Sequence, residues 1–219
     1  MKLDGVLKTR KLSGNIQSER AMAMKRIAVT VTLFVSWWIS YAALAADTYQ
    51  IDPAHTSVGF TVSHLVISEV SGRFNDVAGS VTYDPDKKAV TGAEATIQAK
   101  SIDTKIAKRD DHLRSPDFFD VEKYPTITFE ATKVETDGGK TIMVGKFTMH
   151  GVTKEIRLPF TLKGPIKNPM GPGTRLGVSA ETTLDRKDYG LTWNKALETG
   201  GVMVGEDVKI SISAEAVKK

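Results

Sequence analysis

Strict alternation of apolar and polar residues limits how this chain can fold more than any other feature, because only a β-strand places every second side chain on one face. The segment Lys154–Lys163 shows it most clearly: Ile156, Leu158, Phe160 and Leu162 share one face, and charged or polar residues occupy most of the other. Alternation of this kind predicts an antiparallel strand with one face buried and the other in water.

The same alternation recurs through the chain and predicts eight strands. In the last segment Val208, Ile210, Ile212, Ala214 and Ala216 share one face. Weaker repeats occupy Thr56–His64, Gly72–Tyr83, Val90–Ala99, Thr126–Glu135, Thr141–Met149 and Thr174–Leu184. Turn residues separate several of these segments, at Asp84-Pro85-Asp86, Asp137-Gly138-Gly139, His150-Gly151 and Gly164–Gly173. The strands are therefore expected to follow one another as hairpins.

Eight strands with one apolar face either close into a barrel or stack as two sheets. We favour closure and predict an all-β fold, an eight-stranded antiparallel lipocalin-like β-barrel with a short helical insertion. A barrel of this size is filled by side chains or holds one small ligand. Several residues expected to point inward are small, among them Ala93, Ala95, Ala131 and Ala180. They leave space for an apolar tunnel, although a flattened, tightly packed barrel accounts for them as well.

The segment Asp103–Tyr124 interrupts the strands. Its part Lys105–Arg114 has the composition of a short helix, which Pro116 would end. Two adjacent aromatic residues, Phe118 and Phe119, follow.

This insertion has two interpretations. In the structural one, the helix covers a barrel mouth, Phe118 or Phe119 plugs it, and Arg–Asp pairs hold the loop. In the functional one, Phe118, Phe119 and Tyr124 form the rim of an apolar site, and a polar head group meets one of three basic residues, Arg109, His112 or Arg114. Trp193 lies in a second irregular connection, Asp185–Gly205. Its expected role is either packing or contact with a ligand.

The first 45 residues differ from the rest in charge and hydropathy. They carry seven basic and two acidic residues of the 30 and 26 in the whole chain, so residues 46–219 have a net charge of −1. An uncharged apolar stretch, Ile27–Leu44, follows Lys25-Arg26 and ends in small residues. This pattern predicts a secretory signal peptide, cut after Ala45 or one residue later, with Met24 as a natural start. An uncleaved anchor is the alternative.

Residues 46–219 are thus expected to form a single exported domain. The chain has no cysteine, so it folds there without disulfides. The near-neutral charge of this domain argues against nucleic acid as a partner.

The sequence offers no catalytic or metal motif. Its four histidines lack the i, i+4 helical spacing of a zinc site, and His55 and His64 are an odd number of residues apart, which points them to opposite faces of a strand. No Gly-x-Ser-x-Gly nucleophile elbow is present. We therefore expect no catalytic residue, no metal and no cofactor.

Several stretches, taken in order, resemble the YceI-like or polyisoprenoid-binding family. They are Ile51–His64, Gly72-Arg73-Phe74, Ser101–Thr104, Arg109–Leu113, Asp117–Asp120, Tyr124-Pro125, Phe129, Gly145 to Lys154, and Asp185-Arg186. The resemblance implies an exported, lipocalin-like barrel whose apolar tunnel holds a long isoprenoid chain or a similar lipid, with no established catalysis.

The predicted function is accordingly a periplasmic protein that sequesters or transports a polyprenyl phosphate, a quinone tail or a similar amphiphile, and not an enzyme. The alternatives are an accessory or enzyme acting on a bound quinone at a membrane cytochrome, and a structural stress protein without ligand. A transient inner-membrane partner and a homodimer are compatible with this reading. The predicted ligand contacts are Phe60, Phe74, Arg109, His112, Phe118, Phe119, Tyr124, Phe129, Phe147, Phe160 and Trp193. The tunnel wall is expected to include Ile97, Ile156, Leu158 and Leu162 as well.

Overall fold

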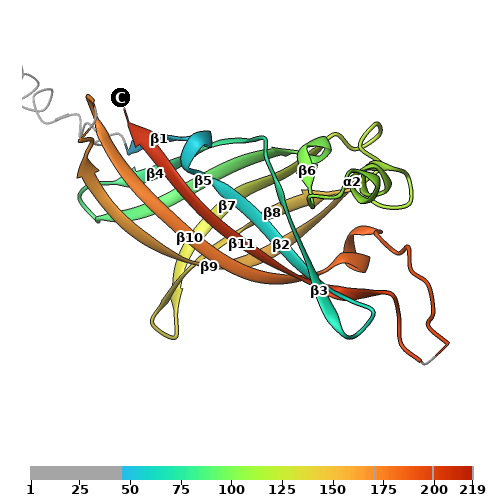
Figure 1. The fold of residues 1–219 in the computed structure, drawn as a ribbon. Helices are drawn as coiled ribbons and strands as arrows, with labels where there is room; N and C mark the ends of the chain where they lie inside the picture. The colour runs from blue at the N-terminus through green and yellow to red at the C-terminus, as the bar shows by residue number, and fades with distance from the viewer. Residues whose placement is uncertain (1–45, 170, 199, 219) are drawn as a thin grey trace, which may run out of the picture. The chain divides into compact units, whose positions relative to one another are not determined.

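Strands make up most of the residues that the computed structural model describes, which are 46–169, 171–198 and 200–218 (Figure 1). These strands are β1 (Asp47–Ile51), β2 (Ser57–His64), β3 (Ser68–Phe74), β4 (Val77–Asp84), β5 (Ala89–Gln98), β6 (Ile102–Asp103), β7 (Thr126–Asp137), β8 (Lys140–Met149), β9 (Val152–Lys167), β10 (Thr174–Asp185) and β11 (Val204–Lys218). The predicted leader, residues 1–45 with Met24, lies outside the described residues. Within them, no helix combines the length and the apolar composition needed to cross a membrane.

The sheet closes into an eight-stranded antiparallel barrel, as the alternation predicted. Its strands pair in the order β1, β4, β5, β7, β8, β9, β10 and β11, and β11 returns to β1 through Gln50 opposite Val217 and Ile51 opposite Ala216. The strand β2 pairs with an earlier part of β11, β3 pairs with β2, and β6 pairs with β3. Closure leaves few unpaired strand edges.

The first strands of the barrel are interrupted. Both β1 and β2 run along β11, separated by the 3-10 helix Pro53–His55, where Pro53 cannot donate to a ladder and Asp52 accepts from the Ala54 N–H. The strand β3 leads into β4 across two residues, and the 3-10 helix Ala99–Ser101 separates β5 from β6. His55 therefore precedes the strand that contains His64, contrary to the expectation that one strand carries both.

Several elements differ from the sequence prediction. The single strand predicted over Gly72–Tyr83 is divided between β3 and β4 by Asn75 and Asp76, and β1 was not among the predicted strands. The helix α2 (Ala107–Arg114) begins two residues later than expected, because Lys105 has φ of 67° and Ile106 is extended. The strand β9 continues through Gly164 to Lys167, although a turn was predicted from Gly164. Gly164, with φ of 95°, supplies the bend, and the register with β10 shifts opposite it.

The barrel interior has two parts. One cluster fills the barrel near β1 and the end of β11; its buried residues are Tyr49, Val81, Tyr83, Val90, Met143, Leu158, Phe160, Leu176, Ala180 and Ala216. We call this cluster the filled half. The second cluster lies toward α2 and includes Val58, Phe74, Val77, Ile102, Ile127, Met149, Tyr189 and Leu191. The cavity described next is bordered mainly by this second cluster.

Candidate ligand-binding cavity

An apolar cavity of about 200 Å³ lies inside the barrel. Its walls come from alternate residues of most strands; β11, for example, contributes Val208, Ile210, Ile212 and Ala214, the face that the alternation predicted. The 3-10 helix Arg186–Tyr189 and the insertion after β6 add residues to the wall. Among the described lining residues only Thr56, Thr182 and Arg186 are not apolar. The cavity therefore suits a hydrocarbon ligand.

Most of the expected tunnel wall lies on this cavity. Phe60, Phe74, Ile97, Phe129, Phe147, Ile156 and Leu158 line it. Phe160 and Leu162 point inward too, but they pack in and against the filled half instead of lining the cavity. Ala131 packs there as well, whereas Ala95 and Ala214 line the cavity. The wall is shorter than predicted because Tyr49 and Tyr83, whose rings meet edge to face at 6.1 Å, occupy that end of the barrel.

The volume limits what fits without rearrangement. Cavities that enclose drug-sized ligands usually measure about 300–1,000 Å³, more than the 200 Å³ present. A long isoprenoid chain therefore requires inner side chains to move, or leaves part of its length outside the barrel.

The two adjacent aromatics after α2 both line the cavity. Phe118 is buried, and its ring lies 5.0 Å from the His112 ring and 5.1 Å from the Trp193 ring. His112 and Trp193 do not line the cavity themselves. Nε2 of His112 is 2.8 Å from a carboxylate oxygen of Asp117. Phe118 thus faces the cavity, and His112 and Trp193 support it from behind.

The basic residues expected to meet a head group are engaged within the insertion. Arg109 donates to Oγ1 of Thr104 at 2.7 Å and to the Thr104 carbonyl oxygen at 2.8 Å. Thr104 and Asp110 are buried, and the Thr104 hydroxyl donates to Asp110. Arg114 donates to the carbonyl oxygens of Lys100 and Ile102, and to a carboxylate oxygen of Asp111 at 3.1 Å. Neither arginine lines the cavity; this geometry corresponds to the structural interpretation, with backbone oxygens and Thr104 as the main acceptors.

Tyr124 also lies away from the cavity lining. Its ring centroid is 4.5 Å from that of His150, whose Nδ1 is 3.0 Å from the Tyr189 carbonyl oxygen. Gly151 has φ of 74°, and a Cβ added to it would stand 2.5 Å from the Tyr124 ring. Tyr124 therefore packs against the tight β8–β9 turn.

Arg186 is a charged residue of the cavity lining that is absent from the predicted ligand contacts. Its side chain is 4% exposed, and it donates to the carbonyl oxygens of Leu191, Gly205 and Val204. Burial lowers the pKa of the guanidinium, while Glu206 and Asp185 act in the opposite direction. The sequence contained a signal, because Asp185-Arg186 is one of the stretches that resemble the family. The Arg186 hydrogen bonds therefore hold the β10–β11 connection at the cavity wall.

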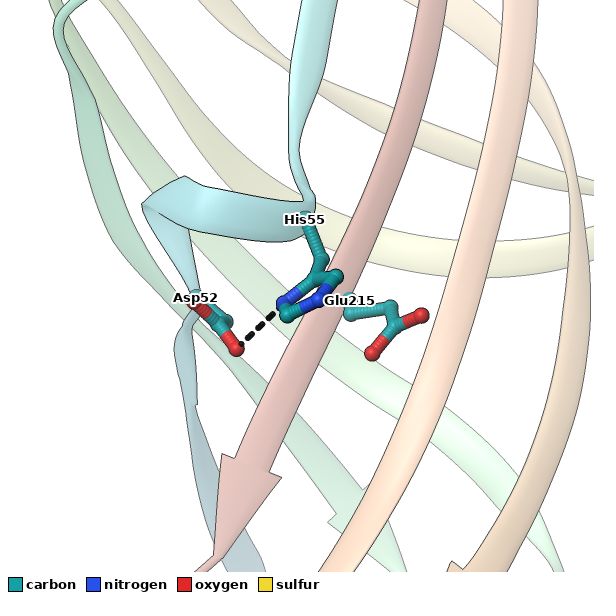
Figure 2. A group of neighbouring side chains, drawn as sticks. All are labelled: Asp52, His55 and Glu215. Carbon is teal, nitrogen blue, oxygen red and sulfur yellow. Dashed lines mark hydrogen bonds and ion pairs between the residues drawn. The ribbon is translucent and has the colours of Figure 1, made fainter.

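A group of Asp52, His55 and Glu215 on the outside of the barrel has the residue types of a metal site (Figure 2). Nδ1 of His55 is 2.9 Å from Asp52. The Arg175 guanidinium bridges the two carboxylates, at 2.9 Å from Asp52 and 3.0 Å from Glu215. The Arg175 guanidinium therefore takes the place that a metal cation would have between the carboxylates. The group is an ion-pair network that joins the 3-10 helix to β10 and β11.

The lowered pKa of Asp103 predicts that the stability of the fold depends on pH. Hydrogen bonds from the backbone and side chain of Lys105, and from Asn75, lower its pKa from 3.8 to about 2. A carboxyl whose pKa is lowered by folding stabilises the fold above its unfolded value, and this contribution disappears as the pH falls toward 2. We expect Asp103→Asn to lower Tm at pH 5 and to have little effect at pH 2. Asp86→Asn serves as the control; an equal loss at both pH values would contradict the assignment.

The fold and the cavity define a class, the small closed β-barrels with an apolar internal site. A family model for the YceI-like domain matches residues 49–216. A UPF0312 protein of Staphylococcus aureus (strain N315) is 41% identical over 167 residues, which cover 76% of this chain and 95% of the relative. The chain belongs to the YceI-like domain family, as the sequence resemblance indicated. The part of the chain that aligns corresponds to nearly the whole of that relative.

Solved structures agree on the fold. A Campylobacter jejuni YceI protein is 34% identical, with a TM-score of 0.61, and the match covers 77% of this chain and 96% of that one. BcnA of Burkholderia cenocepacia has a TM-score of 0.64 at 23% identity, over 76% and 99% of the two chains. A polyisoprenoid binding domain from Saccharophagus degradans has a TM-score of 0.57 at 15% identity, over 80% and 99%. The last two similarities show a shared fold.

Proposed function

We propose that this protein binds and carries a polyisoprenoid or a similar long-chain amphiphile, after export to the periplasm. The observation that carries the proposal is the cavity, whose described lining is apolar except for two threonines and Arg186. At about 25 cal/mol per Å² of apolar surface, burial of even part of a hydrocarbon chain supplies several kcal/mol. The similarity of fold to a domain described as polyisoprenoid binding supports the same ligand class.

The signal-like segment supports export, since Lys25-Arg26 precedes the apolar stretch Ile27–Leu44. A carrier in this compartment exchanges its cargo with a membrane, which accommodates a transient inner-membrane partner. A homodimer is compatible with the proposal as well. The lining offers no pair of described side chains arranged for acid–base or nucleophilic chemistry, so we propose binding and not catalysis.

Freshly purified protein should contain lipid. Extraction with organic solvent followed by mass spectrometry is expected to give close to one long-chain amphiphile per protein. Lipid-free protein should gain stability from added polyprenol: a ligand at about 100 times its Kd contributes ~2.7 kcal/mol, or roughly 5–10 °C in Tm for a domain of this size. If no lipid is extracted and no polyprenyl compound changes Tm, the protein is structural, and the carrier proposal is wrong.

A further inference from the structure

The turn between β2 and β3 has a sequence that its backbone disfavours. Leu65 and Val66 are its central residues, with φ of 55° and 65°, and the Ile67 N–H donates to the His64 carbonyl oxygen at 3.3 Å. Positive φ at both central positions is the conformation that Asn-Gly adopts most readily, whereas a β-branched residue is strained there. Stability of the fold alone would therefore favour other residues at these two positions.

The side chains at this turn lie largely in solvent. Val66 is 67% exposed and Ile67 is 85% exposed. Val202, in the β10–β11 connection, is 36% exposed and directly follows Gly201. The two loops are joined, because the Leu65 N–H donates to the Met203 carbonyl oxygen at 2.8 Å and a Cβ on Gly201 would stand 3.1 Å from Cγ2 of Val66. We call Val66, Ile67 and Val202 the apolar tip.

The apolar tip stands at the cavity end of the barrel. Figure 1 shows the β2–β3 turn and the β10–β11 connection projecting at the same end as α2. Val204, two residues after Val202, lines the cavity and pairs with His64 at the base of the turn. No charged residue occurs in 65–68 or in 200–205. A small exposed apolar surface, flanked by Glu69, Glu198 and Glu206, thus adjoins the wall of the cavity.

We infer that the apolar tip inserts into the interfacial region of a lipid bilayer, and that the cavity exchanges its ligand with the membrane there. The inference deepens the proposed function and rests on it for the identity of the cargo. Contact between the tip and a bilayer can be tested without any ligand. The cavity volume fits this arrangement, since the part of a long chain that does not fit inside the barrel would lie at a lipid surface.

A bilayer suits this surface better than a second protein. A stable protein interface buries about 800 Å² on each partner, and three aliphatic side chains at the ends of two loops expose far less. Binding to a membrane interface scales with the apolar area buried and requires no complementary surface on a partner. It also explains why Val66, a β-branched residue of the tip, occupies a strained turn position, because its benefit arises only when a membrane is present.

Vesicle flotation of residues 46–219 tests the inference, with liposomes of phosphatidylethanolamine and phosphatidylglycerol. The double variant Leu65→Asn, Val66→Gly relieves the strained turn and removes exposed apolar surface. We expect it to have a higher Tm than the parent and about ten-fold weaker vesicle binding. Ile67→Ser should weaken vesicle binding similarly without the gain in Tm.

The matched control is Ile166→Ser. Ile166 is 60% exposed and pairs with Arg175 near the start of β10, whereas the apolar tip lies beyond the end of β10. This variant should float with vesicles like the parent. The inference is overturned if the tip variants float as well as the parent, or if light scattering shows that they dissociate a dimer. Tip variants should still gain Tm from added polyprenol, so a failure of docking is distinguishable from a failure of lipid binding.

Discussion

Ala214→Trp is expected to abolish ligand binding while leaving the barrel folded. Ala214 projects from β11 into the cavity, and an indole ring would occupy most of a space of about 200 Å³. Overpacking costs roughly 1–3 kcal/mol, and the existing void offsets part of this cost. In the thermal measurement with added polyprenol, the stabilisation seen for the parent should disappear, and solvent extraction should recover no lipid.

The neighbouring residue provides the control for this experiment. Ser213 is exposed on the opposite face of the same strand, so Ser213→Trp should bind lipid like the parent. If Ala214→Trp does not fold, Ala95→Phe narrows the cavity from β5 on another part of the wall. Folded cavity variants that retain full lipid binding would place the ligand elsewhere and refute the cavity as its site.

Alternation predicts which residues point into the barrel because the period of a strand leaves only two faces to choose between. Ile156 and Leu158 on β9, and Val208 to Ala214 on β11, line the cavity as this pattern requires. Phe160 follows the same pattern, yet it packs in the filled half. Its surroundings depend on Tyr49 and Tyr83, which are far away in sequence. The alternation predicts which face of a strand points into the barrel. It does not predict which side chains on the opposite wall an inward residue contacts.

The irregular segments were less predictable, because their contacts follow no period. Arg109 and Arg114 have the residue type that binds an anionic head group, but their donors go to Thr104, to Asp111 and to backbone oxygens. The sequence does not indicate the β2–β3 turn, since Leu65-Val66 lacks every residue type that usually marks a turn. Both cases depend on backbone positions that only the folded chain brings together.

Arg186→Met is expected to be the most destabilising single change. Three carbonyl oxygens, of Leu191, Val204 and Gly205, accept from this guanidinium. The Val204 oxygen keeps a second donor, Asn194, at 2.7 Å. The buried Leu191 oxygen and the partly buried Gly205 oxygen would lose their partner at roughly 1–3 kcal/mol each. A total loss of about 2–6 kcal/mol lowers Tm by roughly 4–24 °C in a domain of this size.

Lys187, the next residue, is the control that distinguishes loss of a buried group from loss of a positive charge. Lys187 is exposed and pairs with Glu206, so Lys187→Met should change stability by less than about 1 kcal/mol. Arg186→Lys keeps the charge but loses the planar arrangement of donors, and should recover only part of the stability. Because the three acceptors lie in or next to the β10–β11 connection, hydrogen exchange of Arg186→Met should accelerate first between residues 191 and 205. Uniform acceleration across the barrel would show that Arg186 supports the whole fold and does not specifically hold the connection at the cavity wall.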